Sequence, residues 1–386
     1  MRPENIKLSN WREHPNSKWA FQHVTEVVPC ALINSVNTRD GDPYEKLGTE
    51  AIENYGKFAN YAGLQDFLGS THTNGFIVSH KGRPVASWYA DHFLPTKPHL
   101  LFSVSKSITA TVAGILQAKG LLDVNAPVSE YLELPIASAY FDCTVQHVLD
   151  MTVALDFDED YTSAATDYIK YRQASGWNPV DQTSYNDSLR SFILPLKKRA
   201  DDHGNVFRYR SPNSDLLGMI LASAAKQPFP QLMEQLLWKP MCADSQAWVT
   251  VDHRGDARTA GGICTTIADL SRLGQLISDG GLNKKGERVL SAHWVEEVLH
   301  GGNADAWQKG DFAYILPNGK YRNKWYQYGN DDNAICAMGI HGQYLYINPK
   351  RDVVISKVAS QPLPVDEEVE PTVLKVMDEI ARQLDS

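Results

Sequence analysis

The chain has 386 residues, of which 43 % are hydrophobic and 22 % are charged, and this is the composition of an ordinary globular protein. A chain of this length predicts one large domain or two interleaved ones, with ample core. The net charge of −9 argues against a nucleic-acid partner, because phosphate binding needs clustered Lys and Arg.

The cellular setting is indicated by the N-terminus and the cysteines. The N-terminal segment MRPENIKLSNWREHPNSKWAF lacks the uninterrupted apolar run of a signal peptide. No window approaches the roughly 18 apolar residues of a membrane span, so we expect no membrane partner. An odd number of scattered cysteines without a C-x-x-C pair is typical of reduced thiols, and we expect a cytoplasmic protein. These cysteines are Cys30, Cys143, Cys242, Cys264 and Cys336.

The first predicted element is a β-hairpin in GFIVSHKGRPVASWYA. Residues 76–78 and 85–89 are rich in β-branched and aromatic side chains, and residues 80–83 supply the turn. No internal repeat or Gly/Ser linker separates this hairpin from the rest of the chain.

A helix is predicted next, over residues 103–119 of LFSVSKSITATVAGILQAKGLL. Its apolar residues Ile108, Val112, Ile115 and Leu116 recur at helical spacing, so one face belongs to the core. Gly120 is a suitable residue to end it.

Two interpretations fit the start of this helix, where Ser103 and Lys106 share one face. In the first, Ser103 caps the helix and Lys106 is solvated. In the second, S-x-x-K supplies a nucleophile with its proton acceptor in the next turn.

The middle of the chain is mostly helical, and its end contains strands again. Helical periodicity covers residues 103–119, about 145–152, 186–195, 214–226, 231–238 and 266–278. QYLYINPKRDVVISKVA then predicts a second hairpin that turns over residues 348–352. Apolar residues predict an amphipathic last helix; these are Val373, Val376, Met377, Ile380 and Leu384.

This distribution predicts an α+β fold, with an antiparallel sheet from both chain ends flanked by helices and a mostly helical inserted region. Residues 1–100 and 255–386 form the α/β domain. Residues 101–254 form the helical region, which carries the S-x-x-K helix. We expect a functional site in the cleft between them.

If Ser103 is a nucleophile, it needs a base to take its proton, and a candidate is expected in FRYRSPNSDLLGMILASAA, residues 207–225. Tyr209, Ser211 and Asn213 alternate, so in an extended segment all three point the same way. Asn213 or Ser214 would cap the helix that follows, in which Gly218 allows close packing. A purely structural interpretation is a strand end that leads into a helix cap.

Serine is a poor nucleophile until a base takes its proton. Tyr209 can be that base if a cation such as Lys106 stabilises its phenolate. Alternatively, desolvation lowers the pKa of Lys106, and its amine is the base. The two groups are coupled, and the sequence leaves both routes open.

The third motif is MGIHGQYLYI, residues 338–347. Its glycines flank Ile340 and His341, so the backbone can approach a substrate closely and present N–H groups. One of these N–H groups, with that of Ser103, would complete an oxyanion hole. No HxH or HExxH pattern accompanies His341, so we expect it to be structural and expect no metal or other cofactor.

These motifs, in this order, resemble the penicillin-recognising serine hydrolases, in particular the class C β-lactamase and esterase branch. More narrowly, the chain resembles the 6-aminohexanoate-dimer (nylon-oligomer) hydrolases. The resemblance runs almost end to end. The matching stretches are W-x-x-x-P-x-x-x-W-A-F at 11–21, HLLFSVSKS at 99–107, VLDM at 148–151, DEDY at 158–161, SGW at 175–177, F-x-Y-x-S-x-N at 207–213, GG at 261–262 and GIHGQ at 339–343.

The resemblance implies a role for each matching position. Ser103 is the acylated nucleophile, Lys106 and Tyr209 transfer protons, and the N–H groups of Ser103 and Ile340 form the oxyanion hole. Tyr161 closes over the substrate and contacts the scissile amide. Other substrate-binding positions are Ser211, which supports the tyrosine or the substrate, Asn213, Ala260 and His341.

Three departures narrow the expected substrates. Ala260 replaces the asparagine that precedes the Gly-Gly pair, and Arg172 and Gln173 stand where an acidic residue is expected. Both changes weaken the expectation of activity on the linear nylon dimer. I-H-G replaces the K-T-G motif of β-lactamases, so antibiotic hydrolysis is not expected to be the main activity.

The function predicted from the sequence is hydrolysis of a small ester or amide through an acyl-enzyme on Ser103. An acyltransferase would use the same residues with an alcohol or amine as acceptor. A non-catalytic binding protein with this fold is the alternative from another class. The resemblance also suggests a homodimer.

Overall fold

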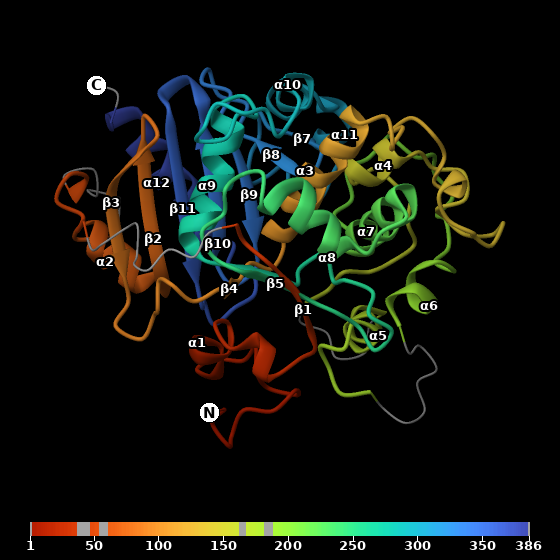
Figure 1. Cartoon of the computed structure of the whole chain (residues 1–386), viewed down its shortest axis with the longest axis horizontal. Helices are drawn as coiled ribbons and strands as arrows, with labels where there is room; N and C mark the ends of the chain where they lie inside the picture. Colours follow the sequence, from red (N-terminus) through yellow and green to blue (C-terminus); the bar gives the residue numbers. More distant parts are fainter. Residues whose placement is uncertain (1, 37–46, 54–60, 162–166, 181–187, 385–386) are drawn as a thin grey trace.

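Strands from both ends of the chain lie side by side in one antiparallel sheet (Figure 1). The computed structural model describes residues 2–36, 47–53, 61–161, 167–180 and 188–384. Within them the large sheet has seven strands in the order β3-β2-β11-β10-β9-β8-β7. Their bounds are β2 Thr73–His80, β3 Arg83–Tyr89, β7 Lys320–Arg322, β8 Trp325–Gln327, β9 Ile335–Gly339, β10 Gln343–Asn348 and β11 Val353–Ala359. The predicted α+β fold is confirmed.

Both predicted hairpins are confirmed, and they meet in the middle of this sheet. The turn between β2 and β3 lies at residues 81–82, and that between β10 and β11 at Pro349–Arg351. β2 then pairs with β11, with Ile77 opposite Ser356. The adjacency of β2 and β11 is what makes one sheet from segments almost 300 residues apart in the sequence.

Helices cover both faces of the large sheet (Figure 1). Alternate residues of β11 point to opposite sides, as the period of a strand requires. Val354 and Val358 belong to the core shared with α9, Ile267–Ser278, whereas Val353 and Ile355 belong to the core shared with α12, Val369–Leu384. The predicted last helix is α12.

The remaining helices are distributed around the two sheets. They are α1 Asn16–Ala20, α2 Leu64–Ser70, α3 Val104–Ala118, α4 Val145–Leu149, α5 Asp167–Ala174, α6 Leu189–Ile193, α7 Pro212–Ala225, α8 Phe229–Leu232, α10 Ala292–His300 and α11 Ala304–Gln308. A π-helical turn, Met233–Trp238, continues α8. Residues 186–187 of the predicted helix 186–195 lie outside the described residues.

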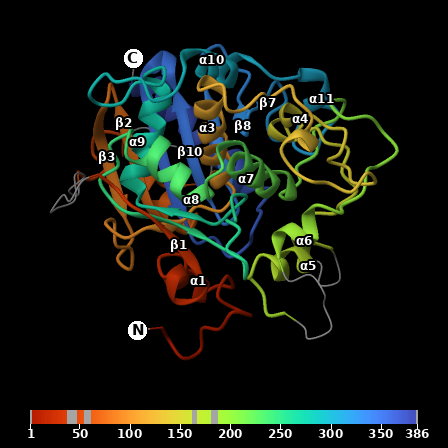
Figure 2. The same cartoon turned by 45° about the vertical axis from the view of Figure 1, so that its right-hand side comes forward.

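α3 lies between the sheet and α7 (Figures 1 and 2). Its residues from Val104 to Leu116 are all buried, so the expectation of one buried face is too narrow. Close packing explains this, because a Cβ on Gly114 would lie 2.4 Å from the Trp294 ring. Gly120 follows the helix and has a left-handed backbone conformation, which agrees with the prediction that this glycine ends the helix.

A second, small sheet was not expected from the sequence. Among the described residues its strands are β1 Cys30–Ile33, β4 His99–Leu100, β5 Ala247–Thr250 and β6 Ile263–Thr265, in the order β1-β5-β6-β4. Strands of two to four residues carry too little periodicity to be recognised. This sheet connects the predicted helical region to the N-terminus, and the division of the chain into two domains stays a prediction.

Two further observations concern the cysteines and the possibility of a membrane span. All five cysteines are unpaired thiols, and four of them are buried. Within the described ranges, no helix is both long and apolar enough to cross a membrane.

Candidate active site

Ser103 lies at the junction of the small sheet and α3. The Leu101 N–H donates to the Ile263 carbonyl at 3.0 Å, and the Ile263 N–H donates to Ser105 Oγ at 3.1 Å. Phe102, the residue between Leu101 and Ser103, has φ +45°, a conformation that non-glycine residues rarely adopt. Strain of this kind is typical of functional sites, where the surrounding contacts hold it.

Ser103 occupies the N-cap position of α3, but its side chain makes no capping hydrogen bond. Instead, Lys106 Nζ lies 2.9 Å from Ser103 Oγ and 2.7 Å from the Ala260 carbonyl oxygen. Lys106 is only 2 % exposed. The interpretation of Ser103 as a simple cap with a solvated lysine is therefore wrong.

Burial makes the Lys106 amine a weaker base than an ordinary lysine. The pKa of Lys106 is lowered from 10.5 to about 7, chiefly by burial, and the positive charge of the nearby Arg258 contributes to this shift. The Glu159 and Asp215 carboxylates oppose this shift. A substantial fraction of Lys106 is therefore a neutral amine near pH 7, with a lone pair that can accept a proton.

A buried chain of contacts fixes the Ala260 carbonyl that holds Lys106. The Ala260 N–H donates to Asp215 Oδ1 at 2.7 Å, and Asp215 forms an ion pair with Arg258. Tyr171 donates its hydroxyl proton to Asp215 Oδ2 at 2.5 Å. Asp215 is fully buried and Arg258 is 3 % exposed, so both charges depend on each other.

Tyr209 shares one hydrogen bond with Ser103 and a second with Tyr326. The Lys106 Nζ lies 5.0 Å from the centre of the Tyr209 ring. Burial raises the pKa of Tyr209 well above its ordinary value, and the Glu159 charge adds to this shift. The phenol is therefore protonated at neutral pH. The structure thus brings the predicted hydroxyl, amine and phenol together.

Glu159 links two of the predicted substrate-binding residues. Its Oε1 accepts hydrogen bonds from Ser211 Oγ at 2.6 Å and from the Tyr161 hydroxyl at 2.8 Å, and its Oε2 accepts the Ser211 N–H. The Ser211 side chain is thereby engaged by Glu159 and fixes the loop that carries Tyr161.

The expectation that Tyr209, Ser211 and Asn213 point the same way in an extended segment is wrong. Pro212 begins α7, Ser211 takes the N-cap position, and Asn213 already lies in the first turn. Proline favours the first position of a helix because its φ is preset and its missing N–H is not needed there. Asn213 is fully buried and donates to Met151 Sδ at 3.5 Å, away from Ser103.

The end of β9 lies directly against the backbone of Ser103. A Cβ on Gly339 would lie 2.6 Å from the Leu101 carbonyl oxygen and 3.0 Å from the Ser103 nitrogen. Only glycine permits this approach, and the next residue, Ile340, lines the same cavity as Ser103.

His341 follows Ile340 and is buried. Its Nδ1 donates to the Gln361 carbonyl at 2.7 Å, and its ring packs against Phe21 and Phe102. Burial lowers the pKa of His341 to about 4, so the ring is neutral. His341 thus holds the strand end behind the site, as expected for a structural histidine.

A small cavity of about 40 Å³ opens at Ser103. Four predicted site residues line it: Ser103, Tyr161, Tyr209 and Ile340. The others among its described lining residues are Phe312, Ile315, Tyr326, Met338, Gly339, Tyr344, Val365 and Glu370. Ala260, Ser211, Asn213 and His341, which the sequence also suggested for substrate binding, are not among the lining residues.

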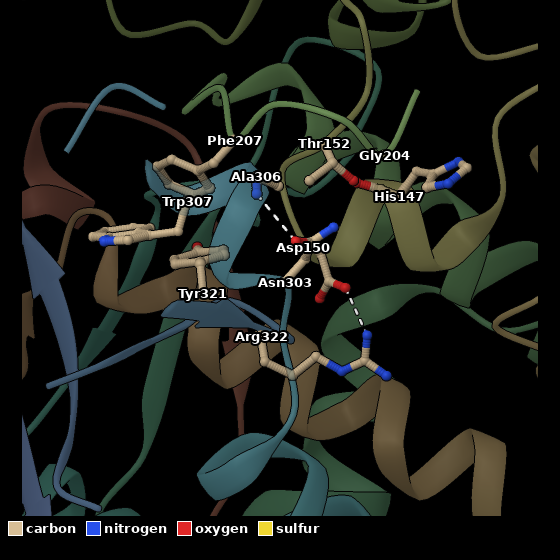
Figure 3. A pocket seen from close by; sticks show the side chains of 10 residues that line it. All are labelled: His147, Asp150, Thr152, Gly204, Phe207, Asn303, Ala306, Trp307, Tyr321 and Arg322. Carbon is tan, nitrogen blue, oxygen red and sulfur yellow. Dashed lines mark hydrogen bonds and ion pairs between the residues drawn. The ribbon is translucent and has the colours of Figure 1, made fainter. Parts of the chain in front are cut away.

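A second cavity lies beside α4 and α11 (Figure 3). Several of its polar side chains are paired with their neighbours. Arg322 contacts Asp150 at 2.7 Å, and Asn303 caps α11 by accepting the Ala306 N–H. None of the predicted site residues lines it. Across the described part of the chain, no group of three or more His, Cys, Asp or Glu side chains could hold a metal ion.

Three residues of the site were not predicted from the sequence. Glu159 belongs to the DEDY stretch, where a carboxylate two residues before Tyr161 was the available signal. Asp215 follows the helix cap and was indistinguishable from an ordinary acidic residue of a first turn. Arg258 is 43 residues from Asp215 in the sequence, and only the folded structure brings the two side chains into contact.

Comparison with known proteins gives concordant matches. The sequence model of the family described as Beta-lactamase matches residues 63–376. The 6-aminohexanoate-dimer hydrolase of Paenarthrobacter ureafaciens is 34 % identical over 361 residues, covering 92 % of this chain and 88 % of the relative.

Among solved structures, a provisionally assigned 6-aminohexanoate-dimer hydrolase from Bacillus anthracis superposes with a TM-score of 0.88. It is 20 % identical, over 100 % of this chain and 99 % of the other. EstCE1, described as a hydrolase with promiscuous acyltransferase activity, has a TM-score of 0.62 at 14 % identity, over 82 % and 96 % of the two chains.

Proposed function

This chain belongs to the β-lactamase family of serine hydrolases, and from that premise we propose that it cleaves a small ester or amide through an acyl-enzyme on Ser103. The observation that carries the proposal is the placement of Ser103 Oγ at a cavity, 2.9 Å from a buried lysine and hydrogen-bonded with a buried tyrosine. A hydroxyl in this setting has both a proton acceptor and a proton donor within reach.

The first step is attack of Ser103 Oγ on the substrate carbonyl carbon. The neutral amine of Lys106 accepts the hydroxyl proton as the new C–O bond forms. The lowered pKa of Lys106 supports this assignment over a Tyr209 phenolate, whose formation burial opposes.

The negative charge then develops on the carbonyl oxygen. The N–H groups of Ser103 and Ile340 are the proposed donors to it, supported by the close approach of Gly339 to the Ser103 backbone. Donors held in place before the reaction need no reorganisation, and each contributes about 10²–10³ in rate.

Collapse of the intermediate breaks the bond to the leaving group. Tyr209 donates its hydroxyl proton to the departing oxygen or nitrogen and regains one from Lys106. Water then attacks the carbonyl carbon of the acyl-enzyme and gives one proton to the Lys106–Tyr209 pair. The pair returns a proton to Ser103 Oγ as its bond to the acyl group breaks and the acid is released. The proposal requires no metal or organic cofactor.

The proposed substrate class rests on the relatives. The 34 % identity to a 6-aminohexanoate-dimer hydrolase supports a small ester or amide. Acyl transfer to an alcohol is a second outcome of the same acyl-enzyme, and the name of EstCE1 records such an activity on this fold.

The test is release of p-nitrophenol from a short-chain p-nitrophenyl ester by the full-length protein. We expect turnover that Ser103→Ala abolishes, and a mass increase of one acyl group on a peptide containing Ser103. Equal rates for the two proteins, or an adduct on another residue, would remove the nucleophile assignment.

A further inference from the structure

No Asp or Glu within the described ranges forms an ion pair with Arg12 or Arg172. Arg12 belongs to the segment before α1, and Arg172 belongs to α5. Arg12 donates to the Asn178 side-chain oxygen, and Arg172 Nη2 donates to the Tyr161 carbonyl at 3.4 Å. The Nε atoms of both arginines are buried and have no hydrogen-bond partner among the described residues. Donors and positive charge are therefore left for a group that the described part of the chain does not supply.

The charges of Arg12 and Arg172, here called the arginine pair, repel each other. The pKa of Arg12 is lowered from 12.5 to about 9, chiefly by burial, and the charges of Arg172 and Arg258 contribute to this shift. Arg258 is neutralised by its ion pair with Asp215. The exposed Glu13 favours protonated Arg12, but its effect is the smallest of these. An anion bound by both members of the arginine pair would offset the repulsion between them.

Aromatic rings hold both guanidinium groups in place. Arg12 Cζ lies 5.4 Å from the centre of the Trp11 ring and 5.7 Å from that of Trp177. Arg172 Cζ lies 4.4 Å from the centre of the Tyr168 ring. These contacts use the face of a guanidinium, whereas its N–H donors lie in its plane and form a fork that matches the two oxygens of a carboxylate.

Arg172 is one contact away from the cavity at Ser103. Tyr161 lines that cavity, and its carbonyl accepts the hydrogen bond from Arg172. The Tyr161 ring also packs edge-on against the Tyr168 ring, with 5.0 Å between their centres, and Arg172 lies over Tyr168. A group bound to Arg172 would therefore lie next to one wall of the proposed active site.

Arg12 borders the same site from the side of the Ser103 backbone. The Trp177 ring beneath Arg12 lies 5.9 Å from the ring of Phe102, the residue before Ser103. Phe102 in turn packs against His341. Burial lowers the pKa of His341 to about 4, and the charges of the arginine pair contribute to this shift. Both positive charges thus act on the surroundings of the proposed nucleophile.

The position of Tyr209 indicates which part of a substrate would meet the arginine pair. Tyr209, the proposed proton donor to the leaving group, packs with Phe312 and Tyr326 in one hydrophobic core. Phe102 and Trp177, which border the arginine pair, belong to another. The leaving group and the acyl chain lie on opposite sides of the scissile carbonyl carbon. A leaving group beside Tyr209 therefore directs the acyl chain towards the arginine pair.

Resting on the proposed hydrolase function, we propose that Arg12 and Arg172 bind a carboxylate at the far end of the substrate's acyl chain. The favoured substrates are half-esters or half-amides of linear dicarboxylic acids. The two guanidinium groups donate N–H groups to the carboxylate oxygens, while Ser103 attacks the carbonyl carbon at the other end of the chain.

The experiment compares p-nitrophenyl half-esters of adipic and suberic acids with the same esters whose free carboxylate is replaced by the isosteric primary amide. In both acids the carboxylate is too distant to attack its own ester readily. The measured quantity is the ratio of kcat/KM for the carboxylate ester to that for the amide ester. This ratio cancels every effect on the shared chemistry at Ser103.

We expect the wild type to prefer the carboxylate ester, and Arg12→Gln and Arg172→Gln each to lower the ratio about tenfold, the scale of one charge-assisted hydrogen bond. The two variants are made separately, so that either one tests the proposal if the other does not fold. Lys170→Gln is the matched control, because Lys170 lies on the same helix, is exposed and is paired with Asp167 at 3.0 Å. Its ratio should equal that of the wild type.

A second arm adds sodium acetate at constant ionic strength. If the arginine pair holds the substrate's carboxylate, acetate should slow the carboxylate ester more than the amide ester in the wild type, and Arg172→Gln should remove this difference. Acetate that changes the turnover of both esters equally, with a ratio that the substitutions leave unchanged, would identify a site for free anions and overturn the assignment to the substrate.

The outcomes separate this proposal from the one on which it rests. Absence of Ser103-dependent turnover of the amide ester by the wild type would overturn the hydrolase function itself. Serine-dependent turnover with the same ratio in Arg12→Gln, Arg172→Gln and the wild type would overturn the subsite alone. An equal fall for both esters, with a lower melting temperature, would likewise overturn it by showing that the arginine pair only stabilises the packing around Trp177.

Discussion

Asp215 Oδ1 accepts the backbone N–H of Ala260 at 2.7 Å, and the carbonyl of the same alanine accepts the Lys106 amine at 2.7 Å. The position of the proposed base therefore depends on a carboxylate that it does not touch. Asp215 is held in turn by Arg258 and Tyr171. A substitution in this buried chain must affect both the fold and the chemistry.

Asp215→Asn is expected to destabilise the protein by about 3–5 kcal/mol, because it leaves Arg258 as an unpaired buried charge. Chemical denaturation monitored by circular dichroism measures the loss. Asp156→Asn is the control, since that carboxylate is exposed and lies 3.9 Å from Arg199. A wild-type free energy of unfolding for Asp215→Asn would contradict the proposed dependence.

Lys106→Arg is expected to lower kcat by about 10²–10⁴-fold for every ester, because a guanidinium stays protonated and cannot accept the Ser103 proton. The variant keeps an N–H donor for the Ala260 carbonyl, so a wild-type circular dichroism spectrum is expected. Turnover within threefold of wild type would exclude Lys106 as the proton acceptor.

Tyr209→Phe is expected to act selectively. p-Nitrophenolate leaves without a proton, whereas an alkoxide or an amine requires one. Hydrolysis of an ethyl ester or anilide should therefore fall much more than that of a p-nitrophenyl ester with the same acyl group. Equal losses for both leaving groups would indicate that Tyr209 also takes the serine proton.

The pH dependence of kcat/KM for a neutral ester should report the Lys106 amine. Because the neutral amine is the active form and the pKa of Lys106 is about 7, kcat/KM is expected to rise through pH 7 and then level off. Glu159→Gln removes a negative charge that favours protonated Lys106, so its midpoint should move to lower pH.

Glu370→Gln supplies the control for this profile. The pKa of Glu370 is also about 7, but Glu370 is not among the charges that shift the pKa of Lys106, so the midpoint should not change. A profile that falls as the pH rises through 7, or a midpoint unaffected by Glu159→Gln, would contradict the assignment.

Gly339→Ala is expected to impair the proposed oxyanion hole. The new Cβ would meet two backbone atoms, Leu101 O at 2.6 Å and Ser103 N at 3.0 Å, and neither can move independently of the nucleophile. We expect kcat to fall about 10²-fold or more. Gly261→Ala is the matched control, because its Cβ would have ordinary contacts from 3.6 Å. Similar activities for the two variants would argue against a donor beside Gly339.

The elements that the sequence predicted well are those whose signal is local. The periodicity of residues 104–118 and the turn residues of both hairpins give α3, β2–β3 and β10–β11 within a few residues. The S-x-x-K and Y-x-S-x-N motifs named three groups that the fold brings together, although their catalytic roles stay a prediction.

What the sequence could not predict depends on contacts between distant segments. Asp215 and Arg258 are ordinary charged residues until the fold buries them together. Glu370 lies more than 250 residues from Ser103, yet both line one cavity. Asn213 shows the opposite error, since an alternation of residues was taken for a strand where Pro212 begins a helix.

The pairing of β2 with β11 also sets the order in which the protein is completed during synthesis. β2 must wait for its neighbour until residues 353–359 have left the ribosome, by which time the Ser103 segment has long been made. Ordering contacts so distant in sequence is slow, because the intervening loop entropy is lost before the pairing compensates it. A nascent chain released before β11 would leave an unpaired edge on β2 and no route to an active enzyme.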